Sequence, residues 1–185
     1  MSGLSELIAE AEQVPRTVNA AFGALSSDQI IWKPSPGEWS IANCLEHLVL
    51  LNEPYFPPIE KILAGKHKVS FWERVPMLPA FFGRLVLATV QPESKRKIKA
   101  RPAFVPELSD TDIGIRTRFL THQVELIRLM KATAELPIDK IVITSVVSPV
   151  VTYSLLDAYR ILVAHEHRHL QQAERVMRAV GFPTH

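Results

Sequence analysis

The sequence predicts an all-α fold: a four-helix bundle with a long crossover connection between its second and third helices. Four segments carry apolar residues at helical spacing, and a proline-containing stretch separates the second segment from the third. Only one segment has the β-branched composition of a strand. With 185 residues, of which 47% are hydrophobic, the chain can bury one core, so we expect a single domain over residues 1–185.

The first helix is expected over residues 4–25, with Pro15 bending or splitting it. Residues 26–39 are predicted to form a loop. Ser40 is a favourable N-cap for the second helix, which should end at Gly65. A bend or break is expected late in this helix because it contains three prolines, Pro54, Pro57 and Pro58.

Residues 66–107 form the predicted crossover connection, with one short helix at about 79–88. Ser109 or Asp110 is expected to cap the third helix, which should run to about Glu135. Residues 136–151 are partly β-branched but have no visible partner strand, so they are predicted to be an extended connection. The fourth helix should start near Ser154 and end before Gly181.

The charge pattern and composition exclude several classes of protein. The net charge of +2 gives no strong reason to expect nucleic acid or a membrane as a partner. No apolar run approaches the length of a bilayer span, and the first residues do not have the pattern of a signal peptide. The single cysteine, Cys44, cannot form an internal disulfide. We therefore expect a cytoplasmic protein.

Two of the seven histidines suggest a metal site on the fourth helix. His165 and His169 lie four residues apart, so they share one face and one ion could touch both rings. His167 should face the opposite way. The alternative is a pair of partly exposed histidines that bond to neighbouring helices, and the residues alone favour neither interpretation.

Two imidazoles leave most of a coordination sphere open, so a third ligand is needed. His47 is the best candidate because it lies near the apolar stripe of the second helix. His122 is expected to be a packed, hydrogen-bonded core residue, with a fourth-ligand or supporting role as the alternative. Cys44 is expected to be a small buried hydrophobe rather than a ligand.

Residues 165–169 also match H-E-x-x-H, in which the glutamate can act as a catalytic base beside zinc. Glu166 turns about 100° away from His165 on a helix. A solvated Glu166 is the first interpretation of this pattern. A catalytic role for Glu166 is the alternative.

The sequence resembles the DinB/YfiT-like family. Residues 39–48, W-S-I-A-N-C-L-E-H-L, resemble one family signature, and the H-x-x-x-H-x-x-Q of residues 165–172 resembles a second. The resemblance implies a four-helix bundle with a long crossover. It also implies one divalent metal ion bound by His47, His165 and His169, with zinc or nickel favoured over manganese or iron.

The resemblance also implies the classes of function to consider. Relatives include thiol-dependent transferases, so a metal that activates a low-molecular-weight thiol toward an electrophile is the favoured function. A metal-dependent hydrolase that activates water is the alternative enzyme. A non-catalytic metal-binding or stress-associated protein is the alternative of another class. The expected partners are a small-molecule substrate, a thiol cosubstrate and, as in some relatives, a second copy in a homodimer.

Overall fold

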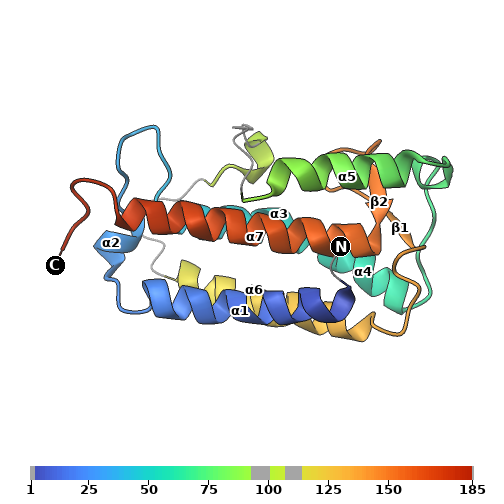
Figure 1. The fold of residues 1–185 in the computed structure, drawn as a ribbon, viewed down its shortest axis with the longest axis horizontal. Helices are drawn as coiled ribbons and strands as arrows, with labels where there is room; N and C mark the ends of the chain where they lie inside the picture. The colour runs from blue at the N-terminus through green and yellow to red at the C-terminus, as the bar shows by residue number, and fades with distance from the viewer. Residues whose placement is uncertain (1–2, 93–100, 107–113, 185) are drawn as a thin grey trace.

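The computed structural model describes residues 3–92, 101–106 and 114–184, and helices dominate it (Figure 1). The α-helices are α1 (Leu4–Phe22), α2 (Ser27–Ile31), α3 (Ile41–Asn52), α4 (Phe56–Leu63), α5 (Leu78–Val90), α6 (Ile115–Ala132) and α7 (Leu155–Met177). Three 3-10 turns are η1 (Glu53–Tyr55), η2 (Trp72–Arg74) and η3 (Pro102–Phe104). Two short strands are β1 (Val142–Thr144) and β2 (Thr152–Ser154).

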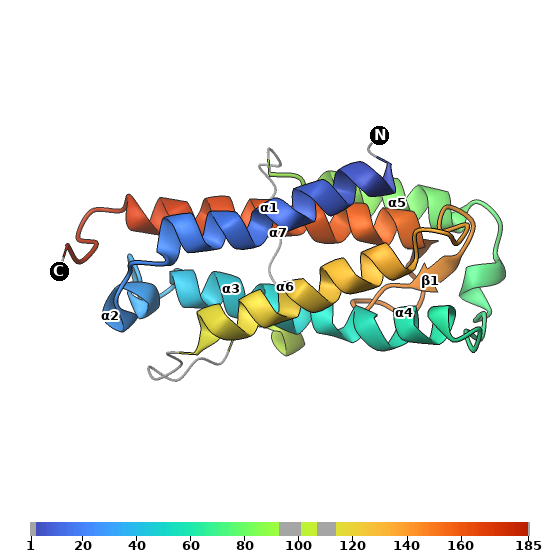
Figure 2. The same ribbon diagram turned by 90° about the horizontal axis from the view of Figure 1, so that it is seen from below.

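The bundle is formed by α1, the bent pair α3 and α4, α6 and α7. Both α1 and α3 pack against α6 and against α7, so the four members surround a common interior (Figures 1 and 2). The crossover helix α5 lies outside this group and packs along α7 and β2. The all-α four-helix prediction is confirmed. Nowhere in the described ranges is a helix both long enough and apolar enough to span a bilayer.

Several predicted helix boundaries are confirmed by local interactions. The hydroxyl of Ser40 accepts a hydrogen bond from the backbone N–H of Asn43, as expected of an N-cap. Ser154 caps α7 in the same way. The break at the second helix is also confirmed, because α3 ends at Asn52 and α4 begins after the η1 turn. Pro15 does not split α1, which continues through it.

Two local predictions were wrong. Residues 26–39 are not all loop, because Ser26 and Gln29 form a reciprocal capping box that starts α2. Residues 136–151 are not only an extended connection, because β1 pairs in antiparallel fashion with β2. The short helix predicted at 79–88 is present as α5. The predicted caps Ser109 and Asp110 lie outside the described residues, and α6 is described from Ile115.

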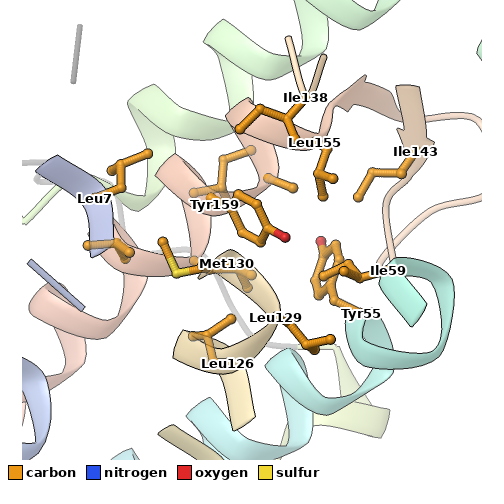
Figure 3. Packing of buried hydrophobic residues seen from close by; sticks show 14 of the residues in the cluster. Leu7, Tyr55, Ile59, Leu126, Leu129, Met130, Ile138, Ile143, Leu155 and Tyr159 are labelled. Carbon is orange, nitrogen blue, oxygen red and sulfur yellow. The ribbon is translucent and has the colours of Figure 1, made fainter. Parts of the chain in front are cut away.

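The buried apolar side chains form two clusters, one toward each end of the bundle. The first includes Tyr55, Met130 and Tyr159, with the hairpin residue Ile143 beside them (Figure 3). The hydroxyls of Tyr55 and Tyr153 bond to each other inside it. The second cluster joins apolar residues of α1, α3, α6 and α7: Val18, Phe22, Ile41, Leu45, Phe119, Ala173 and Val176 are among its members.

Buried polar side chains mark the boundary between these two clusters. On α7 the first cluster ends at Val163 and the second begins at Leu170, with buried polar residues between them. On α6 the same boundary falls at His122 and Gln123. Polar groups at this depth need partners or a ligand, since an unpaired buried polar atom is costly. The boundary therefore holds the candidate functional residues.

Candidate metal centre

His47 is oriented by the crossover connection. Its Nδ1 atom lies 2.7 Å from the backbone carbonyl oxygen of Phe104, which belongs to η3. A carbonyl can only accept, so Nδ1 carries the proton and Nε2 keeps its lone pair for a ligand. Burial lowers the pKa of His47, and the bond to Phe104 partly opposes that shift. The ring is therefore neutral at neutral pH.

His165 and His169 face each other one turn apart on α7. Their Nε2 atoms lie 3.0 Å apart, and both side chains are buried. Burial, with the nearby His47 as a secondary cause, lowers the pKa of His169 to about 3. Burial also holds the pKa of His165 well below its usual value, with His169 and His47 as secondary causes. His167 is only half-buried, as its position on the helix predicts.

The three rings converge on one place. One nitrogen from each of His47, His165 and His169 lies within 4.8 Å of the others. Two nitrogens bound to one tetrahedral zinc ion, each about 2 Å from it, are separated by about 3.3 Å. The observed separations are compatible with a shared ion. Three buried, neutral imidazoles are also the protonation state that a metal requires, so this donor set fits a divalent ion.

Trp39 forms one wall of this imidazole cluster. Its ring stacks on His169 with centroids 5.5 Å apart, and it lies 4.8 Å from the ring of His47. These ring contacts place Trp39 against two of the three histidines, where its indole limits the access of water to the imidazoles.

Glu166 is buried, so the prediction that it is solvated was wrong. One carboxylate oxygen accepts hydrogen bonds from the side-chain amides of Asn52 on α3, at 2.9 Å, and Gln123 on α6. Burial raises the pKa of Glu166 to about 8, and these two bonds oppose the shift. The helix turns Glu166 away from His165 into the bundle, where other helices cover it. Its catalytic role stays a prediction.

His122 lies outside the imidazole cluster. Its ring stacks between Phe56 and Phe119, with centroids 5.1 and 6.0 Å away. It is buried, as expected of a core residue, but neither ring nitrogen has a hydrogen-bond partner among the described residues. Burial lowers its pKa to about 4. The structure therefore places His122 in the core, and the expected hydrogen bond is not seen.

Cys44 is fully buried in the second apolar cluster, and burial raises its thiol pKa to about 12. The expectation that Cys44 is a small buried hydrophobe is confirmed. It does not belong to the group of potential ligands formed by the three histidines. A thiol in this state is neither a good nucleophile nor a good ligand.

Sequence reasoning missed Asn52, Gln123 and the carbonyl of Phe104. Asn52 lies four residues after the buried Leu48, and Gln123 lies four after the buried Phe119. Helical spacing therefore placed both amides on buried faces, which was a usable signal. The carbonyl of Phe104 contacts His47, which lies 57 residues earlier in the chain. Spacing along one helix could not predict this contact.

Comparison with known proteins assigns the fold and the family. A sequence model described as the DinB superfamily matches residues 10–173, which is most of the chain. The chain belongs to the DinB superfamily. No curated protein matches it.

One similar solved structure is YfiT from Bacillus subtilis, described as a probable metal-dependent hydrolase with an unusual four-helix bundle topology. The TM-score is 0.59 at 16% identity, over 99% of this chain and 91% of that one. At this identity the likeness shows the fold alone. It agrees with the bundle of this DinB-superfamily chain.

Proposed function

We propose that this protein is a metal-dependent enzyme that transfers a low-molecular-weight thiol to an electrophile. His47, His165 and His169 would hold one divalent ion, with zinc or nickel favoured. The observation that carries this proposal is the meeting of three buried, neutral imidazoles, two of them with Nε2 atoms 3.0 Å apart. A divalent ion with three protein ligands keeps an open position and lowers the pKa of a thiol or water there.

The protein's own residues have positioning roles in this proposal. The carbonyl of Phe104 fixes the tautomer of His47, so that its Nε2 atom is directed to the cluster. Trp39 covers His47 and His169 and keeps bulk water away from them. Exclusion of water strengthens the interactions of any charged group that binds at this place.

A thiol substrate is favoured because the cluster has no protein nucleophile of its own. Cys44 is buried, with a thiol pKa raised to about 12. Glu166 is held by the amides of Asn52 and Gln123 and is not a member of the imidazole cluster. A free thiol loses its proton near pH 8.5, far more readily than water, so it depends less on a protein base.

Hydrolysis is the second candidate, supported by the description of YfiT as a probable metal-dependent hydrolase. The two enzymes differ in whether product formation requires a thiol. The purified protein, loaded with zinc or nickel, would be mixed with an aryl halide or an ester, with and without glutathione, bacillithiol or mycothiol. If the protein is a thiol transferase, free thiol should disappear at the same rate as product forms, and no product should form without thiol.

Product without thiol would instead identify a hydrolase. No turnover in either assay, with the metal retained, would leave a non-catalytic metal-binding protein. The His169→Ala variant should abolish the thiol reaction. The matched His167→Ala variant, altered on the half-buried side of the same helix, should keep it.

A further inference from the structure

The crossover helix α5 presents an apolar ridge that the described part of the chain leaves uncovered. Met77 lies at the N-cap of α5, and Phe81 and Leu85, four residues apart, share one face of the helix. They are 86%, 60% and 45% exposed. Scattered exposed hydrophobic residues are ordinary, but a continuous ridge of large ones marks an interaction surface.

Two more aromatic side chains lie in the segment that leads into α5. Phe71 is 73% exposed, and its ring contacts the ring of Trp72, which is also exposed, with centroids 5.3 Å apart. The η2 turn packs against β1 and β2, and α5 packs against β2, so both groups lie at the hairpin end of the molecule (Figures 1 and 2). The apolar surface therefore extends beyond the helix.

Met77 is held in a conformation that favours glycine. Its φ angle is 68°, in the left-handed region that side chains other than glycine rarely adopt. Among the described residues, Met77 alone adopts a positive φ without being a glycine. A large side chain in this region carries a conformational cost, and such residues concentrate at functional places. Here the turn directs an apolar side chain outward at the start of α5.

Within residues 64–92 the exposed charges are all positive. Lys66, Lys68, Arg74 and Arg84 are exposed, and Arg84 lies between Phe81 and Leu85 in sequence. Residues 64–92 contain a single acidic residue, Glu73, and its side chain is buried. Its carboxylate accepts hydrogen bonds from Ser70 and Thr144, so it does not offset the exposed cations at the surface. The net charge of +2 for the whole chain does not reveal this local excess of lysine and arginine.

We propose that this surface, formed by the segment from Lys66 through η2 and the following turn to α5, docks on an anionic membrane. Its apolar side chains would enter the headgroup region while the lysines and arginines bind lipid phosphates. No helix spans a bilayer within the described residues, so the protein would lie on the membrane. The net charge of the whole chain did not predict a membrane partner, because it does not report where cations gather.

A second copy of the chain is a poorer occupant of this surface. In a two-fold interface the same patch meets itself, so its four cations would face four others, and residues 64–92 offer no exposed carboxylate to pair with them. Like charges at such an interface oppose association. An anionic lipid layer supplies the missing opposite charge across the whole patch.

The test is co-sedimentation of the full chain with vesicles. Vesicles with equal parts of phosphatidylcholine and phosphatidylglycerol should bind the protein, vesicles of phosphatidylcholine alone should not, and added salt should weaken binding. The Arg74→Ala/Arg84→Ala variant should bind at least tenfold more weakly, since each cation contributes roughly fivefold. The Phe81→Ser/Leu85→Ser variant should also lose binding.

Matched controls lie away from this surface. Val124→Ser changes an exposed apolar residue of α6, and Lys33→Ala changes an exposed cation after α2. Both should bind like the parent. Equal binding to both vesicle types, no binding to either, or unchanged binding by the double variants would overturn the proposal. So would a dimer in light scattering that the Phe81→Ser/Leu85→Ser variant dissociates, which would assign the surface to a second copy.

Discussion

The side-chain amide of Asn52 donates a hydrogen bond to the carboxylate of Glu166 at 2.9 Å, which joins α3 to α7 inside the bundle. Gln123 donates to the same oxygen atom from α6. All three side chains are buried. A buried carboxyl group that loses its donors keeps its desolvation cost, so this three-helix network should contribute to stability.

Replacing Asn52 should therefore destabilise the fold. Asn52→Leu keeps the branched shape of the side chain but removes the donor, and the free energy of unfolding should fall by about 1–3 kcal/mol. Urea denaturation measures it. In a double-mutant cycle with Glu166→Leu, the combined loss should be smaller than the sum of the single losses. Strict additivity would show that the two side chains do not stabilise each other.

Metal content should depend on the imidazole cluster. Elemental analysis of the purified parent should find about one divalent ion per chain, as a three-ligand site predicts. His47→Ala and His169→Ala should each lose most of it, because two imidazoles leave the ion poorly held. His167→Ala is the control and should retain the parent content. Full retention in both ligand variants would reject the assignment.

His122 should make stability depend on pH. Its pKa is lowered to about 4 in the folded chain, against 6.5 when unfolded, so between these values the unfolded state binds more protons. Stability from this residue is complete above pH 6.5 and declines as the pH falls toward 4. The loss could reach roughly 3 kcal/mol.

The His122→Phe variant isolates this contribution. It keeps an aromatic ring between Phe56 and Phe119 but cannot be protonated. The other buried histidines still titrate in the variant, so the informative quantity is the difference between the two proteins. Chemical unfolding at several pH values between 4 and 7 should show a shallower decline for the variant. Parallel curves would contradict the buried, neutral state of His122.

Cys44 should resist alkylation in the folded protein. Its side chain is fully buried, and its thiol pKa is raised to about 12, so both access and the thiolate form are suppressed. Iodoacetamide at pH 8, followed by mass spectrometry, should label the native chain far more slowly than the urea-unfolded chain. Rapid native labelling would reopen Cys44 as a candidate nucleophile.

The helices and the pairing of His165 with His169 could be predicted because both depend on spacing along one helix. Ser40 and Ser154 likewise cap their helices through nearby backbone atoms. The helix α2 could also have been predicted from the sequence, since Ser26 and Gln29 have the spacing of a capping box. Local chemistry was sufficient in each case.

The burial of Glu166 could not be predicted in this way. Helical geometry turns it away from His165, but whether that side meets water depends on which helices pack there. Helix α7 contacts α1, α3 and α5, so little of its circumference is free. The partner of β1 was hidden for a related reason: β2 has three residues, and the last, Ser154, is also a helix cap.

The order of the imidazoles along the chain has a consequence for biosynthesis. His47 is synthesised before His165 and His169, which lie on α7. Until that helix emerges, the two histidines that lie beside His47 in the folded protein are not yet present. A metal site made of these three imidazoles would therefore assemble only after α7 has been synthesised, and a chain that stalls before α7 would lack two of the three proposed ligands.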